Sequence, residues 1–352
     1  MGLGIAIVID GTADMELSDA AWVEVHQRMG ETTKYRIRYD IDIDQGDFPD
    51  LIDSRLDAGS ELAVVAPISG ANNYLVKGPV TGQRVYFQHG GGGSYLEVEG
   101  ADTSIKMARE SQAVIWSDLT DSDAVSQILG GYGYTADVDS TQAGHEEDKH
   151  TLVQRASDLD FVRRLARRNG FLFWIDCDKA GTETAHFRRP DLGGKSVLNL
   201  DINISSNNLG TLDLMWDVER STSVIAAQLN LNDKTSIDGA VSASPLSPLG
   251  SQSLSDITGD TRSAHLHAPV DDAGDLTARG EGALIEDAWF IRATGQTSVN
   301  ALGDIVRANT IVNLRGVGTR HSGNYYVASV RHTIDPSAHH MEFELVRNGW
   351  GN

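Results

Sequence analysis

Several stretches of this chain have residue types and spacings that could carry chemistry. In one of them aspartates alternate from Asp40 to Asp44 and precede Gly46, as in a calcium-binding loop. The glycine falls one place late, however, and the twelfth position holds Leu51 rather than a glutamate. Because isoleucines stand between the aspartates, the alternation favours the solvent face of a strand over a calcium site.

His89 and the glycines Gly90–Gly93 have the composition of an oxyanion loop, in which backbone N–H groups face a developing negative charge. A hydrolase of that kind needs a G-x-S-x-G elbow for its nucleophile, and the chain contains none. These glycines are not followed by the Gly-Lys-Ser or Gly-Lys-Thr of a phosphate-binding loop either. A turn between two strands is therefore the favoured interpretation.

His265 and His267 stand two residues apart, so a strand would place both on one face, where they could flank a metal. No acidic or histidine partner stands at a spacing that would complete the site, and the surrounding stretch has the composition of a loop. Carboxylate pairs for glycosidase chemistry are too numerous among 50 acidic residues for one to be singled out. The sequence predicts no catalytic residue, no cofactor and no metal.

The charge of the chain narrows the classes of partner. Its 352 residues include 29 Lys and Arg against 50 Asp and Glu, a formal net charge of −21. Because DNA-binding proteins need clustered cations, sequence-specific nucleic-acid binding is disfavoured. The acidic side chains could line a channel and repel a polyanion, or hydrate the outer surface. The single cysteine, Cys177, has no partner for an internal disulfide and is expected to be buried.

The N-terminal residues are apolar, but no basic stretch precedes them and Asp10 ends the run, so no signal peptide is expected. No window approaches the roughly 20 apolar residues of a membrane-spanning helix. We therefore expect synthesis in the cytoplasm and no membrane anchoring.

The clearest local pattern runs from His150 to Asp176. Ser157, with an aspartate three residues later, has the form of an acidic capping box, so a helix should begin there. Apolar residues then recur at spacings of three and four on one side, and Asn169-Gly170 predicts a left-handed stop. Phe171–Ile175 has the aromatic and β-branched residues of a buried strand. The other side of the helix carries Arg163, Arg164, Arg167 and Arg168.

The remaining patterns are mostly β, so the expected fold class is mainly β with an α+β middle domain. Residues 1–105 alternate like an antiparallel barrel or sandwich, residues 106–208 hold the helix-strand unit, and residues 209–352 return to strands around a loop-rich insertion at 232–282. Strands are expected at 5–9, 22–25, 35–43, 62–68, 73–76, 84–88, 95–98, 198–204, 212–218, 224–231, 311–314, 325–332 and 341–347, and a helix or strand at 283–292. A short helix is expected through Val125 and Leu129, with Thr120, Ser122 and Asp123 as candidate caps and Gly130-Gly131 as its stop.

Three groups of motifs follow one another in a specific order. The region from Val98 to Gly133 precedes the stretch that contains Gln154, Ser157-Asp158, Asp160-Phe161, Arg164-Leu165-Ala166 and Gly170. Near the C-terminus a G-x-Y-x-V-x-x-V-x-H-x-I pattern at 323–334 precedes an F-x-L-x-R-N pattern at 343–348. In this order the motifs resemble those of the phage late control protein D family and of the hub part of VgrG-type spike proteins.

This resemblance implies a structural tail hub (baseplate hub) of a contractile injection system. Each chain would form two tube-like antiparallel β-barrels plus a helix-containing domain, and three chains would form a pseudo-sixfold ring that adapts the sixfold tail tube to the threefold central spike. The implied partners are two further copies in a homotrimer, a separate spike protein, the tail tube protein and other baseplate proteins. DNA or cargo would pass through the lumen of a virion tail, a tailocin or a cellular injection system.

The resemblance also implies a structural role for the residues around position 160. Its structural motif is formed by Gln154, Ser157, Asp158, Asp160, Arg164 and Gly170, and the arginines Arg163, Arg167 and Arg168 become candidates for inter-subunit contacts. A hub is not an enzyme. The alternative is a tail-associated or secreted hydrolase that degrades cell walls, which would need two carboxyl groups with perturbed pKa values in a cleft.

Overall fold

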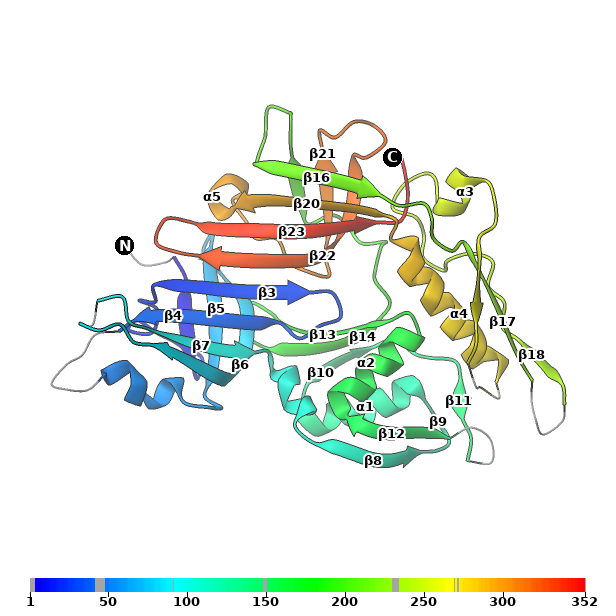
Figure 1. The fold of residues 1–352 in the computed structure, drawn as a ribbon, viewed down its shortest axis with the longest axis horizontal. Helices are drawn as coiled ribbons and strands as arrows, with labels where there is room; N and C mark the ends of the chain where they lie inside the picture. Colours follow the sequence, from blue (N-terminus) through cyan, green and yellow to red (C-terminus); the bar gives the residue numbers. More distant parts are fainter. Residues whose placement is uncertain are drawn as a thin grey trace.

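The computed structural model describes residues 4–41, 48–90, 92–147, 151–229, 234–268, 270 and 272–351. Antiparallel strands dominate, and helices are few and short (Figure 1), which confirms the expected mainly β fold class. Within these ranges no helix has both the length and the apolar character needed to span a bilayer.

The largest sheet contains a run of eight neighbouring strands, which we call the eight-strand run. In spatial order they are β16 (Thr211–Trp216), β20 (Ile291–Ser298), β23 (His339–Arg347), β22 (Gly323–Ile334), β3 (Trp22–Arg28), β4 (Lys34–Asp40), β7 (Tyr95–Ala101) and β6 (Ala71–Tyr86). The C-terminal and N-terminal halves of the run meet where β22 pairs with β3. Figure 1 shows the run stacked from β16 at the top to β6 at the bottom.

Two long strands, β6 and β22, also belong to a second layer. The first part of β6 pairs with β5 (Glu61–Ile68), and after a register shift between Val80 and Gly82 the strand pairs with β7. β22 pairs first with β21 (Ile311–Arg315) and, beyond a shift between Val327 and Ser329, with β3. β-Bulges bend and twist a strand, so each half of the sheet curls over the interior. The layer is completed by β1 (Ala6–Ile9), β2 (Thr12–Asp14) and β15 (Leu198–Asp201).

One hydrophobic core lies beneath the eight-strand run and draws on both ends of the chain. Alternate strand residues point into it, such as Val23 and Ile37 from the N-terminal half and Val330 and Phe343 from the C-terminal half. Full burial of a side chain of this size stabilises a fold by about 1.5–3 kcal/mol. The two β regions therefore pack as one unit.

A second module holds the two longer helices of the middle region. Helices α1 (Asp121–Tyr132) and α2 (Asp158–Arg168) pack on a small sheet and share a core with it that includes Phe161, Leu165, Phe173 and Phe187. The strands of this module are β10 (Thr135–Val138), β14 (Glu183–Arg188) and β13 (Leu172–Cys177) in the sheet, β8 (Ser111–Trp116) with β12 (Leu152–Ser157), and β9 (Leu119–Thr120) with β11 (Gly144–His145).

A third module projects beside the sheet, at the right of Figure 1. Its core joins Val224, Leu276 and Leu284, because α4 (Ala273–Ala288) packs against β17 (Ser223–Leu229). The segment 232–282, expected to be loop-rich, contributes β18 (Ser236–Asp238), α3 (Leu254–Thr258), β19 (Ser263–Leu266) and the start of α4. Short connecting helices are η1 (Pro49–Ile52), η2 (Ser54–Leu56), η3 (Thr103–Ala108) and α5 (Val299–Leu302).

Some local predictions need correction. Helix α1 runs through Gly130-Gly131 and ends at Gly133, whose φ of +75° is the left-handed conformation of a helix stop. The strands expected at 73–76 and 84–88 are one strand, β6, and the sequence pattern did not predict β12. The ambiguous segment 283–292 is helical to Ala288 and then enters β20. Asp42–Gly46 of the calcium alternative, Gly91 and His150 lie outside the described residues.

Candidate functional site

Helix α2 begins and ends as the sequence predicts. Ser157 Oγ accepts a hydrogen bond from the backbone N–H of Asp160 at 3.2 Å, and its hydroxyl donates to the Asp160 carboxylate at 3.0 Å. Gly170, just after the helix, has a φ of +66°. A Cβ added to Gly170 would lie 2.9 Å from the backbone of Gly282 in α4. The glycine is therefore required both for the turn and for the close packing of α2 on α4.

The motif residues Gln154 and Asp158 connect three elements. The Gln154 side chain is fully buried, donates to Asp158 Oδ1 at 2.6 Å and accepts from Trp116 Nε1 at 3.2 Å. Asp158 Oδ2 also accepts from the hydroxyl of Tyr132 at the end of α1 at 2.8 Å. These bonds fix β8, α1 and the start of α2 relative to one another, which is a scaffold role.

The arginines on the other side of α2 have different surroundings. Arg163 donates to Thr32 Oγ1 in the β3–β4 turn at 2.6 Å, and burial lowers the pKa of its guanidinium. Arg164 donates to the carbonyl of Val153 at 3.3 Å. Arg167 is exposed and has no side-chain partner among the described residues. Arg163 and Arg167 both line a cavity of about 620 Å³ between α2 and the β3–β4 turn.

Arg168 lies in a buried polar network that the sequence did not reveal. Its guanidinium donates to both carboxylate oxygens of Asp121, from Nε to Oδ2 at 2.6 Å and from Nη2 to Oδ1. The same carboxylate accepts from Asn169 Nδ2 at 2.7 Å and lies 2.8 Å from His145 Nε2. Burial acts to raise the pKa of Asp121, but the bonds from His145 and Arg168 outweigh it and lower that pKa to about 2. The network ties the start of α1 to the end of α2.

The free edges of the eight-strand run form a second candidate site, which local patterns could not predict. Within the described chain β16 pairs only with β20, and the segment of β6 from residue 81 to 86 pairs only with β7. Exposed apolar side chains lie at both edges. Met215 is 58% and Trp216 48% exposed on β16, and Tyr86 is 45% and the neighbouring Phe87 57% exposed at the end of β6. Exposed strand edges with apolar side chains are typical of assembly surfaces.

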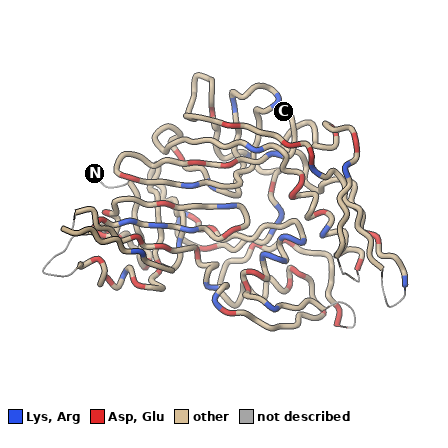
Figure 2. Tube along the Cα trace, in the orientation of Figure 1, with Lys and Arg blue, Asp and Glu red and all other residues tan. Residues whose placement is uncertain are grey.

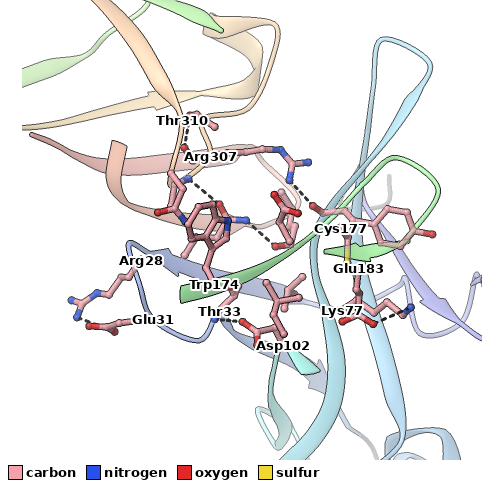
Figure 3. Close-up of a pocket in the computed structure, with 18 residues that line it drawn as sticks. Arg28, Glu31, Thr33, Lys77, Asp102, Trp174, Cys177, Glu183, Arg307 and Thr310 are labelled. Carbon is pink, nitrogen blue, oxygen red and sulfur yellow. Dashed lines mark hydrogen bonds and ion pairs between the residues drawn. The ribbon is translucent and has the colours of Figure 1, made fainter. Parts of the chain in front are cut away.

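A small cavity with carboxyl groups in its wall bears on the alternative that the chain is a hydrolase. It has a volume of about 100 Å³ and lies where β3, β6 and β13 meet the loop at residues 307–310 (Figure 3). Burial raises the pKa of Asp102 in its wall to about 6, yet this carboxylate accepts backbone N–H groups from Thr33 at 2.5 Å and Ser104 at 2.9 Å. Glu183 faces Lys77 at 3.4 Å. The cavity is smaller than the roughly 300 Å³ of ordinary ligand pockets, so these carboxyl groups have no room for a sugar.

The single cysteine and two of the histidine pairs have the following surroundings in the described chain. Burial raises the pKa of the half-buried Cys177 thiol to about 12, which disfavours a reactive thiolate. His265 and His267 are exposed, and no set of three His, Cys, Asp or Glu in the described ranges could hold a metal ion. His332 Nδ1 lies 3.0 Å from His339 Nε2 in the core, and burial lowers the pKa of both, that of His339 to about 4.

The fold is that of phage tail proteins. A tail protein from Neisseria meningitidis has a TM-score of 0.67 at 12% identity and matches over 98% of this chain and 96% of its own. The 43 kDa tail protein of prophage MuSo2 from Shewanella oneidensis has a TM-score of 0.65 at 13% identity over 98% of both chains. A component of the type VI secretion system of E. coli, described as similar to the T4 tail proteins gp27 and gp5, has a TM-score of 0.59 at 14% identity over 95% of this chain and 76% of its own.

The chain belongs to the family described as the Alg8 N-terminal domain, whose model matches residues 3–336. That family differs from the late control protein D family that the motifs resemble. No curated protein sequence matches the chain.

Proposed function

We propose that this chain is the hub of a contractile injection machine, in which three copies form a pseudo-sixfold ring between a sixfold tail tube and a threefold spike. One observation carries the proposal: the eight-strand run is continuous and ends in two free edges, β16 and the second half of β6. Head-to-tail contact of these edges would remove both of them from solvent, which is how a barrel avoids uncontrolled strand pairing.

The directions of the two edge strands suit this contact. Every neighbouring pair within the run is antiparallel. Because the run has an even number of strands, β16 and β6 point in opposite directions, and β6 of one copy can pair antiparallel with β16 of the next. The exposed apolar side chains at both edges would then be buried between subunits. A heterologous (head-to-tail) contact of this kind produces a closed ring when the rotation between neighbouring copies divides a full turn evenly.

The pseudo-sixfold symmetry would follow from the two halves of the run. β16, β20, β23 and β22 form one four-strand unit, and β3, β4, β7 and β6 form another. Three copies would therefore give six such units and a barrel of 24 strands. The tail proteins and the type VI secretion component with the same fold support a role in an injection machine. We propose a separate spike, a tail tube and other baseplate proteins as partners, assembly in a tail or baseplate, and no enzymatic activity.

Within this ring Arg167 is our candidate among the three proposed contact arginines. It is exposed and free of partners in the described chain, whereas Arg163 and Arg168 already bind Thr32 and Asp121. The motif residues around Ser157 would hold α2 in place beside the ring.

Native mass spectrometry and electron microscopy of the purified chain test the proposal. The expected species is a ring with three times the 38.0 kDa mass of one chain, in equilibrium with the monomer at low concentration. A chain that stays monomeric up to high micromolar concentration, or one that forms a closed symmetric dimer, would contradict it.

A further inference from the structure

The eight-strand run has one face on the core and an opposite face, turned toward the viewer in Figure 1, over which no element of the described chain lies; we call it the open face. The open face carries equal numbers of basic and acidic side chains. The basic ones are Arg28, Lys34, Arg36, Arg38, Arg84, Arg292 and Arg331, and the acidic ones are Glu24, Asp40, Glu97, Glu99, Asp213, Glu342 and Glu344. This balance differs from the net charge of −21 of the chain as a whole.

The charges of the open face are also paired. Arg36 on β4 stands opposite both Glu24 on β3 and Glu99 on β7, with N···O distances of 3.3 Å and 3.9 Å. Arg84 and Glu97 stand opposite each other on β6 and β7 at 3.6 Å. Figure 2 shows the basic and acidic segments side by side along these strands.

Other cations of this face have carboxylate neighbours as well. The further pairs are Arg28 with Glu31 at 3.8 Å, Arg38 with Asp40 at 3.6 Å, Arg331 with Glu24 at 3.9 Å, and Arg292 with Glu344. Lys34 is the one cation of the face without such a neighbour among the described residues. Opposite charges on neighbouring strands stabilise a sheet modestly, and here they also cancel the field of the face.

In the proposed ring the open face would line the lumen. Closing the run edge to edge leaves one face inside and one outside, and the core with the second strand layer behind it is too bulky for the inside. We propose that the open face is a charge-paired lining along which a DNA duplex passes without being bound or repelled. This inference rests on the proposed ring and differs from the acidic channel lining that was one of two alternatives for the charge of the chain.

The physical reason lies in how proteins bind phosphates. Affinity for DNA comes from cations that release condensed counterions when they meet the backbone. Arginines that already face a carboxylate gain little from a phosphate, while the net charge of zero on this face removes long-range repulsion. The arginines of the open face could therefore bind DNA, but the neighbouring carboxylates neutralise them.

Removing carboxylates should reveal that surface. In the variant Glu24→Gln, Glu99→Gln, Glu344→Gln each change keeps the shape of the side chain, and together the three changes free Arg36, Arg331 and Arg292. The matched control, Glu110→Gln, Glu147→Gln, Glu219→Gln, makes the same change of charge at exposed positions away from the open face. Fluorescence anisotropy with a labelled 30-base-pair duplex, titrated with salt, measures the affinity of both variants and of the unaltered chain.

We expect the open-face variant to bind the duplex at least about tenfold more tightly than the control at low salt, with an affinity that falls steeply as salt rises. The unaltered chain should bind no better than the control. Equal affinities of the two variants, or strong binding by the unaltered chain, would overturn the inference. The mass of each variant is measured in parallel, so loss of the ring would count against the proposed function separately from the result with DNA.

Discussion

At the scale of single residues, Asp121 has the largest predicted effect on stability. Replacing it with alanine removes the acceptor of Arg168, Asn169 and His145 and leaves the largely buried guanidinium of Arg168 without its carboxylate. Loss of one partner of a buried ion pair typically costs about 3–5 kcal/mol. We expect the Asp121→Ala variant to lose about that much free energy of unfolding, measured by urea denaturation.

Asp123→Ala is the matched control for this variant. Asp123 lies in the same first turn of α1 and caps it together with Thr120, but it is exposed. Loss of such a cap costs about 1 kcal/mol. Equal effects of the two substitutions would show that Asp121 is merely another capping residue.

The buried His332 and the half-buried His339 predict a dependence of stability on pH. Burial lowers the pKa of His339 from 6.5 to about 4 and that of His332 further, and His26, Arg307 and His340 add positive charge nearby. The unfolded chain therefore binds more protons than the folded one as the pH falls below 6.5. The free energy of unfolding should therefore be unaffected by His339 above pH 6.5. It should fall by roughly 3 kcal/mol towards pH 4, because the unfolded chain takes up a proton at this residue more readily.

Thermal denaturation of the His339→Gln variant between pH 4 and pH 7 measures this contribution. The unaltered chain should lose stability more steeply over this range than the variant. Asp102, whose folded pKa is raised to about 6, acts in the opposite direction but equally in both proteins. Exposed His265 provides the control, since His265→Gln should leave the pH profile unchanged. Parallel profiles for His339→Gln and the unaltered chain would contradict the prediction.

At the scale of elements, α2 and its stop could be predicted because their signals are local. The Ser157 cap, the apolar spacing and Gly170 act within a few residues of one another. The ion pair between Arg168 and Asp121 could not be predicted. The two residues are 47 positions apart in the sequence, and this spacing says nothing about their distance in the fold. Helix α1 also continues through Gly130-Gly131 to Tyr132, whose hydroxyl binds Asp158, since each glycine costs a helix only about 1 kcal/mol.

The contact between α2 and α4 gives a prediction for Gly170. A methyl group there would lie 2.5 Å from Ile285 Cδ1 and 2.9 Å from Gly282 Cα, and it would also strain a left-handed residue. Gly133 has nearly the same conformation, but nothing lies within 4 Å of an added Cβ. Overpacking typically costs about 1–3 kcal/mol beyond the strain. Gly170→Ala should therefore destabilise the chain by that much more than Gly133→Ala in urea denaturation, and equal losses would show that packing on α4 is unimportant.

At the scale of the whole molecule, the arrangement of the two β regions was beyond the reach of sequence patterns. Alternation predicted most strands of the eight-strand run, but it carries no information on which strands become neighbours. The decisive pairing joins β3 to β22, where Arg28 stands opposite Ser329 across almost the entire chain. The free edges follow from that order, so Met215 and Tyr86 became candidates only in the folded structure.

The two edges give the sharpest test of head-to-tail assembly. Lysines placed at one edge should block contact there, because charged side chains protect strand edges from pairing. The replaced side chains are exposed, so each variant should still fold. Thr211→Lys with Met215→Lys blocks β16, and Val85→Lys with Tyr86→Lys blocks the end of β6. Native mass spectrometry of each purified variant should show monomers only.

A mixture of the two variants should behave differently from either alone. Each variant retains the edge that the other has lost, so one intact contact can form between them, and the remaining two edges are both blocked. Heterologous assembly therefore predicts a dimer of the two variants at 1:1 ratio, with no ring and no longer chain. A symmetric contact between identical edges predicts instead that one of the variants dimerises alone. Differential mass labelling of the two variants separates these outcomes, and a mixture that contains only monomers would show that the edges do not join the subunits.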